Sequence, residues 1–138
     1  MPFVTQRRVE FVDTDMAGIM HFSRFFIWME SVEVELMRSL GLSVVMEQEG
    51  QAIGFPRVAA QCTYKKPVRF ENLVNCAITI AKMGVKSITY NHVFSFNDQR
   101  IAEGSIVTCC TEKTKDALQS IPIPDKIRVA LLASTAAT

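Results

Sequence analysis

The longest amphipathic pattern in the chain runs from Phe22 to Leu40, where apolar residues recur every three or four positions, the period of an α-helix. Its apolar positions are Phe22, Phe25, Phe26, Met29, Val32, Leu36, Met37 and Leu40, with Ile27, Trp28 and Val34 beside this stripe. Ser23 stands where a capping hydroxyl is expected, and Gly41 where a helix ends on a left-handed residue. We predict one long helix that is covered on most sides, as a curved sheet would cover it.

On both sides of this segment the pattern changes to alternation with a period of two, which is typical of β-strands. One alternating run, residues 3–12, precedes the helix. Four follow it, at residues 57–65, 73–83, 87–96 and 100–111. Turn residues separate the later runs so closely that neighbouring strands should pair antiparallel.

Two shorter elements complete the predicted order. Residues 43–50 suggest a short helical turn, and Asp125 stands where it could cap a last helix that reaches Ala133. The order of strand, long helix and four strands predicts an α+β domain. Its antiparallel sheet would have about five strands wrapped around one long central helix.

Composition limits the possible functions. The chain has 138 residues, of which 49% are hydrophobic and 21% charged, so a single folded domain over residues 1–138 is expected. The formal net charge of +1 gives no field that would attract nucleic acid. There is no signal-peptide pattern and no run of about twenty apolar residues that could span a membrane, so a cytoplasmic location is expected.

The cysteines and histidines do not form a metal-binding pattern. Cys62, Cys76, Cys109 and Cys110 lie in strand-like runs without metal-ligand spacing. We therefore expect reduced thiols, no metal and no cofactor. His92 lies on the apolar side of a strand and is expected to be a core residue with satisfied hydrogen bonds.

The loop before the long helix carries two carboxylates and a glycine, in the order Asp13, Asp15 and Gly18. The free amides at a helix start can stabilise an oxyanion, and a carboxylate beside them could support acyl transfer. Loop aspartates also commonly cap turns, and the residues alone leave both interpretations open.

Residues 9–20, read with the acidic Glu30 and the closing pair Leu40-Gly41, resemble the signature of hotdog-fold acyl-CoA thioesterases of the 4-hydroxybenzoyl-CoA thioesterase family. The shared pattern is an aspartate, one residue, a second aspartate, two residues and a glycine, followed by the long helix. The resemblance covers roughly residues 5–123 and is sharpest over residues 7–42. It differs at His21-Phe22, where bacterial relatives often carry Tyr-His, so the acyl group stays open.

The resemblance implies hydrolysis of an acyl-CoA, aromatic or short-chain, to free acid and coenzyme A. Asp15 would be the nucleophile or general base, the amide of Phe22 would hold the oxyanion, and Gly18 would shape the loop. His21 could orient the substrate or act as an acid. Two alternatives stay open, namely a hotdog hydratase or dehydratase acting on acyl thioesters and a non-catalytic acyl-CoA-binding dimer.

Further residues are candidates for substrate binding. Glu30 shares a helix face with Phe22, and Glu33 shares one with Phe26, so each glutamate is either a site residue or a charge at a subunit boundary. Phe26 is itself a candidate, because it could line a pocket for an aromatic acyl group, or it could belong to the core. Lys86 and Ser87 follow a basic turn that could hold coenzyme A phosphates or could simply be solvated. Hotdog relatives pair edge to edge, which implies a homodimer or a homotetramer.

Overall fold

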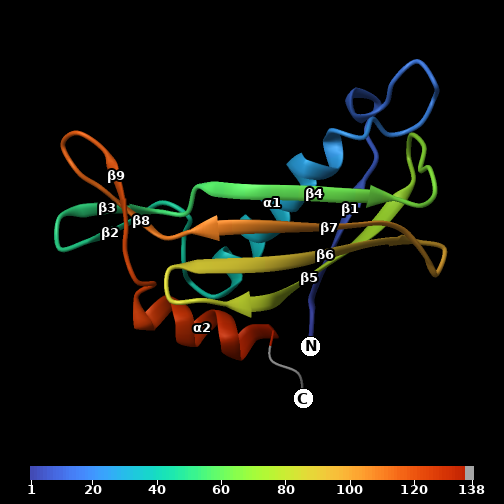
Figure 1. Cartoon of the computed structure of the whole chain (residues 1–138). Helices are drawn as coiled ribbons and strands as arrows, with labels where there is room; N and C mark the ends of the chain where they lie inside the picture. Colours follow the sequence, from blue (N-terminus) through green and yellow to red (C-terminus); the bar gives the residue numbers. More distant parts are fainter. Residues whose placement is uncertain (136–138) are drawn as a thin grey trace.

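The computed structural model describes residues 1–135, and its main body is a five-stranded antiparallel sheet with one long helix across one face (Figure 1). The strands lie in the order β1-β5-β6-β7-β4. Their bounds are Phe3–Arg8 for β1, Arg57–Tyr64 for β4, Leu73–Met83 for β5, Ser87–Phe96 for β6 and Gln99–Cys109 for β7. This architecture confirms the predicted α+β class, with an antiparallel sheet of five strands around one long helix.

The long helix, α1 (Arg24–Ser39), buries its apolar stripe against the inner face of this sheet. Met29, Val32 and Leu36 are fully buried there. Gly104 on β7 lets the helix approach closely, since a Cβ at that position would meet the Met29 side chain and lie 2.9 Å from the carbonyl oxygen of Gln61. Gly41 ends the helical segment with a φ of +72°, as predicted.

The predicted helical turn at residues 43–50 is wrong, because residues 46–54 form a hairpin. Strands β2 (Met46–Gln48) and β3 (Gln51–Gly54) pair antiparallel. Glu49 and Gly50, with φ of 52° and 79°, form the two-residue turn between them, and such left-handed pairs match the twist of a hairpin. The strands β8 (Thr111–Lys113) and β9 (Leu118–Ser120) extend this hairpin to a second sheet of four strands, which the alternation pattern did not reveal.

The first strand ends at Arg8 rather than Val12, because a short 3₁₀ turn, η1 (Phe11–Asp13), follows it. The Asp13 carboxylate accepts a hydrogen bond from the Glu10 amide at 2.8 Å, and the Asp13 amide donates to the Glu10 carbonyl at 2.9 Å. These two bonds close the turn. At the other end of the chain, the predicted last helix is present as α2 (Asp125–Thr135) and packs beside β5 (Figure 1). Asp125 is its first residue rather than the predicted cap, because the Pro124 carbonyl accepts the amides of Ile127 and Arg128, and the helix reaches Thr135 rather than Ala133.

Candidate active site

The loop between η1 and α1 is closed by its own backbone. Thr14 and Met20 form an isolated antiparallel bridge, and the Asp15 amide donates to the Ile19 carbonyl at 3.1 Å. Gly18 turns the chain with a φ of +78° and donates its amide to the Asp15 carbonyl at 2.9 Å. A side chain at this φ is strained, so the glycine is what permits the tight return.

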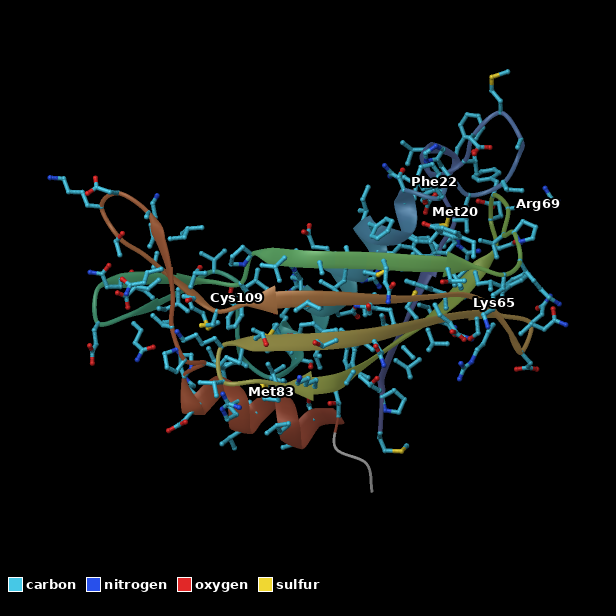
Figure 2. All side chains as sticks on the ribbon, viewed as in Figure 1. Met20, Phe22, Lys65, Arg69, Met83 and Cys109 are labelled. Carbon is cyan, nitrogen blue, oxygen red and sulfur yellow. The ribbon has the colours of Figure 1, made fainter. Side chains whose placement is uncertain are left out.

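The segment that follows β4 holds this loop in place. The Met20 amide donates to the Val68 carbonyl at 2.8 Å, and the Arg69 guanidinium lies 3.4 Å from the Gly18 carbonyl oxygen. Figure 2 shows Met20, Phe22, Lys65 and Arg69 together at one end of the sheet. Residues far apart in sequence therefore build this end of the molecule jointly.

The two loop aspartates have different environments. Asp13 is 4% exposed, and its two carboxylate oxygens accept from the Glu10 amide at 2.8 Å and from Arg24 Nε at 2.9 Å. Asp15 is exposed, and one of its oxygens accepts from the Ala17 amide at 2.8 Å. Its other oxygen has no hydrogen-bond partner among residues 1–135. Asp13 therefore braces the loop, while Asp15 retains an oxygen that can react.

Asp15 lies on the wall of a cavity of about 410 Å³, which is within the usual range for small-molecule sites. The lining residues are Asp15, Ile19, Met20, Phe22, Phe25, Tyr64, Lys65, Lys66, Pro67 and Val68. The cavity thus combines one carboxylate, three aromatic rings and two ammonium groups. The aromatic walls can accept an apolar group, and the two lysines can attract negative charge.

The Phe22 amide is available as a donor, since it makes no hydrogen bond within the described part of the chain. Its carbonyl oxygen accepts from the Tyr64 hydroxyl at 2.9 Å, which ties the peptide before α1 to the end of β4. Burial, followed by the neighbouring Cys62, raises the pKa of Tyr64 to about 12, so the phenol stays protonated and remains a donor. Sequence reasoning missed Tyr64, because its contact with Phe22 spans 42 positions of the chain.

His21 is beside this peptide but engages Ser23. Its Nδ1 lies 2.7 Å from the Ser23 hydroxyl and accepts the Ser23 amide at 3.3 Å. Ser23 occupies the predicted N-cap position, but its hydroxyl contacts His21 rather than an amide of the helix, so the predicted capping bond is not formed.

Glu33 lies in a second polar cluster, outside the Asp15 cavity. It is 2% exposed and lies 3.0 Å from the Arg57 guanidinium. Burial raises the pKa of Glu33 to about 7, outweighing the attraction of Arg57, and the charge of Glu30 adds to this rise. Its Oε1 has no partner among residues 1–135. Glu30 lies 4.0 Å from Arg57 with a largely exposed side chain, so it is not on a packed face.

The remaining predicted site residues are not brought to Asp15 within this chain. Phe26 is half-buried against the core and does not line the cavity. Lys86 and Ser87 lie at the turn into β6, which pairs Ser87 with Cys109. Met83 and Cys109 mark this end of the sheet in Figure 2, opposite the end that carries Met20 and Phe22.

His92 is buried as predicted. Neither of its ring nitrogens has a hydrogen-bond partner among the described residues, so the prediction that its hydrogen bonds are satisfied is wrong. Burial lowers the pKa of His92 to about 4, so the ring is neutral at ordinary pH. Within residues 1–135, no group of three His, Cys, Asp or Glu residues could hold a metal ion. No helix in the same part of the chain is long and apolar enough to cross a membrane.

Comparison with known proteins identifies the family. A family model described as the thioesterase-like superfamily matches residues 9–131. A 1,4-dihydroxy-2-naphthoyl-CoA hydrolase of Synechococcus sp. (strain WH7803) is 27% identical over 137 residues, covering 93% of this chain and 87% of the relative. The solved structure of a gentisyl-coenzyme A thioesterase is 32% identical, with a TM-score of 0.81 over 94% of this chain and 99% of the other.

A crystal structure of an aspartate-to-asparagine mutant of 4-hydroxybenzoyl CoA thioesterase, complexed with 4-hydroxybenzoyl CoA, has the same fold at 18% identity. Its TM-score is 0.82 over 94% of this chain and 98% of the other. The architecture and the family match agree with the resemblance seen in the loop and helix motif. The chain belongs to the thioesterase-like superfamily, which confirms the predicted resemblance to hotdog thioester hydrolases.

Proposed function

We propose that the chain hydrolyses an acyl-CoA thioester to a free acid and coenzyme A at the Asp15 cavity, with an aromatic acyl group as the preferred substrate. One observation carries this proposal. Within residues 1–135, one oxygen of the Asp15 carboxylate has no hydrogen-bond partner, and Asp15 lies on the wall of a cavity lined by Phe22, Phe25 and Tyr64. The relatives named for aromatic acyl-CoA substrates support the choice of acyl group.

Two routes lead from this geometry to the same products. In the first, an Asp15 oxygen attacks the thioester carbon, the C–S bond breaks, the thiolate takes a proton, and water hydrolyses the acyl-aspartate anhydride. In the second, Asp15 removes a proton from a water molecule that attacks the same carbon. The Phe22 amide stabilises the oxyanion in both routes, and Lys65 and Lys66 attract the coenzyme A phosphates.

A substrate panel tests the proposal. Purified protein is incubated with acetyl-, palmitoyl-, 4-hydroxybenzoyl-, gentisyl- and 1,4-dihydroxy-2-naphthoyl-CoA, and free thiol is measured with a thiol reagent. We expect the highest kcat/KM on an aromatic substrate. If none of the five is hydrolysed above background, the proposal is wrong.

The same preparation separates the alternatives. A hydratase would remove the conjugated absorbance of an enoyl-CoA and leave the thioester intact. A non-catalytic binder would gain thermal stability from an acyl-CoA that survives unchanged for hours.

We also propose a homodimer or homotetramer in the cytoplasm. β4 is an edge of the five-stranded sheet, and its residues are exposed except for the half-buried Cys62, which supports pairing with a second copy. Four predicted binding residues could contact a substrate at Asp15 only from a neighbouring subunit, namely Glu30, Glu33, Lys86 and Ser87. Sedimentation velocity tests this point, and a monomer at assay concentration would exclude their role.

A further inference from the structure

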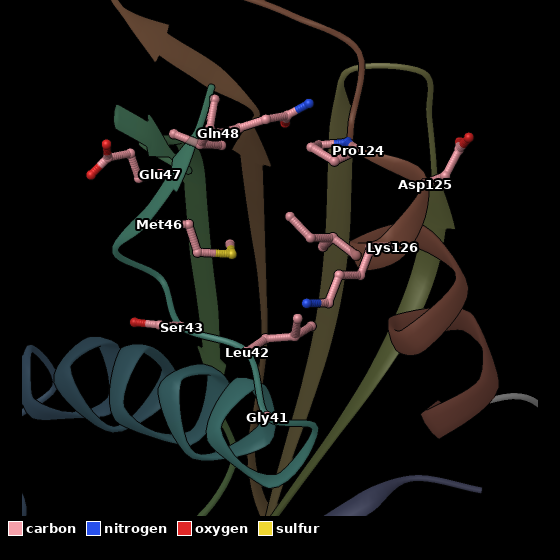
Figure 3. Close-up of a pocket in the computed structure, with 11 residues that line it drawn as sticks. Gly41, Leu42, Ser43, Met46, Glu47, Gln48, Pro124, Asp125 and Lys126 are labelled. Atoms are coloured by element: carbon pink, nitrogen blue, oxygen red, sulfur yellow. The ribbon is translucent and has the colours of Figure 1, made fainter. Parts of the chain in front are cut away.

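A cavity of about 550 Å³, larger than the one at Asp15, lies elsewhere in the molecule. It is open to solvent on one side and is lined by the segment after α1, the β2–β3 hairpin and the start of α2 (Figure 3). Its volume is within the range of about 300–1,000 Å³ for small-molecule sites. The hydrolysis reaction uses none of its residues.

The inner walls of this cavity are apolar. Ile53 and Ile127 are buried, and Leu42 and Met46 are half-buried against the core. In Figure 3 the Leu42 and Met46 side chains point into the space between the hairpin and α2. Such walls favour a ligand with an apolar body, because binding would remove apolar surface of both the ligand and the cavity from water.

Lys126 is the charged group that reaches into this space. Figure 3 shows its ammonium pointing from the first turn of α2 toward Leu42, whereas the carboxylates of Glu47 and Asp125 point away. Lys126 makes no hydrogen bond or ion pair with any of residues 1–135. The start of α2 adds the positive end of a helix dipole to the same wall. The cavity therefore offers one ammonium beside apolar surface, and the two carboxylates of its lining, Glu47 and Asp125, make no ion pair with that ammonium within residues 1–135.

We infer that this cavity binds an apolar monocarboxylate. The apolar body lies against Leu42, Met46 and Ile127, and the carboxylate accepts hydrogen bonds from the Lys126 ammonium. A single cation suits a monoanion better than a phosphate dianion. If the proposed hydrolase function holds, the acid released at Asp15 belongs to this ligand class, so the cavity is a second site for the product. The binding itself does not depend on that function.

Titration with 2-naphthoate tests the inference, with amide chemical shifts of the ¹⁵N-labelled protein as the measurement. 2-Naphthamide is the neutral ligand control. Lys126→Met removes the charge and keeps the apolar stem, and Lys115→Met, at an exposed lysine in the turn between β8 and β9, is the matched protein control. Asp15→Asn is titrated in parallel, because 2-naphthoate could also enter the Asp15 cavity.

We expect saturable binding of 2-naphthoate below about 1 mM, with shifts at Leu42, Met46 and Lys126. Lys126→Met should weaken the binding of 2-naphthoate at least about fivefold. 2-Naphthamide, which lacks the carboxylate, should bind wild type more weakly by a similar factor. Lys115→Met and Asp15→Asn should leave it unchanged. The inference is overturned by equal binding to Lys126→Met, by shifts confined to residues 14–20, or by no saturation. Because Asp15→Asn tests hydrolysis separately, failure of either proposal is recognisable by itself.

Discussion

Glu33 and His92 are buried groups whose pKa values are displaced in opposite ways, and this makes the pH dependence of stability a direct test of the core. Burial raises the pKa of Glu33 from 4.5 to about 7 and lowers that of His92 from 6.5 to about 4. Between pH 4.5 and 7 the folded state holds the Glu33 proton that the unfolded state has lost. Glu33 therefore lowers the free energy of unfolding as pH rises through this window.

His92 acts with the opposite sign. Between pH 4 and 6.5 the unfolded state binds a proton that the folded state excludes, so stability rises with pH and is lost as pH falls through this window. Each displacement covers about 2.5 pH units, and one unit corresponds to about 1.4 kcal/mol, so each group contributes about 3 kcal/mol across its window. Between pH 4.5 and 6.5 the two groups change the free energy of unfolding with pH at equal and opposite rates, so their pH dependences cancel there.

Urea unfolding at intervals from pH 4 to 8 measures the effect. The stability of Glu33→Gln relative to wild type should rise by about 3 kcal/mol from pH 4.5 to 7, because the variant no longer carries the Glu33 penalty. His92→Phe should show the reverse, with its relative stability falling by a similar amount from pH 4 to 6.5. Differences that stay constant with pH for both variants would refute the reasoning.

Two further predictions concern single contacts. Tyr64→Phe removes the hydroxyl that holds the Phe22 carbonyl at 2.9 Å, so we expect kcat to fall about tenfold with KM and the melting temperature nearly unchanged; an unchanged kcat would show that this bond does not position the loop. Gly104→Ala places a Cβ against Met29 and the Gln61 carbonyl and should cost about 1–3 kcal/mol in urea unfolding. Gly54→Ala is its control, since a Cβ there meets only the Thr111 hydroxyl at 3.9 Å, and equal losses for the two variants would contradict the packing argument.

The long helix and the five strands of the main sheet could be predicted because each carries a sustained periodic pattern, although β1 ends at Arg8 rather than Val12. β6 matches the predicted residues 87–96, since its inner face is a run of alternating buried side chains. The β2–β3 hairpin could not be predicted in this way, because strands of three and four residues are too short to establish a period. The residues that indicate the hairpin are the turn residues Glu49 and Gly50, but the composition around them was interpreted as a helical turn.

The parts of the site that depend on residues close together in sequence could be predicted, and the contacts between distant segments could not. The spacing of Asp13, Asp15 and Gly18 indicated the loop, but η1 depends on a side-chain bond from the Glu10 amide to Asp13 that no alternation pattern reveals. Tyr64 contacts the loop only because the sheet places the end of β4 beside it, so this contact could be recognised only from the fold. The raised pKa of Glu33 likewise depends on the depth of burial and not on residue type.

In the proposed mechanism, Asp15 performs the chemistry while Asp13 braces the loop. Asp15→Asn keeps the side-chain shape and the acceptor for the Ala17 amide but removes the nucleophile and base. Asp13→Asn weakens the contact with Arg24, and we expect a loss of about 1–3 kcal/mol in unfolding free energy with little loss of activity.

The decisive measurement is kcat of both variants on the best acyl-CoA substrate, with the unfolding free energy of each measured alongside. We predict that Asp15→Asn folds like wild type and binds substrate, while its kcat falls at least about a hundredfold. Asp13→Asn should keep kcat within about tenfold of wild type. An inactive Asp13→Asn with an active Asp15→Asn would reverse the assignment, and full activity in both would move the reaction to Glu30 or Glu33.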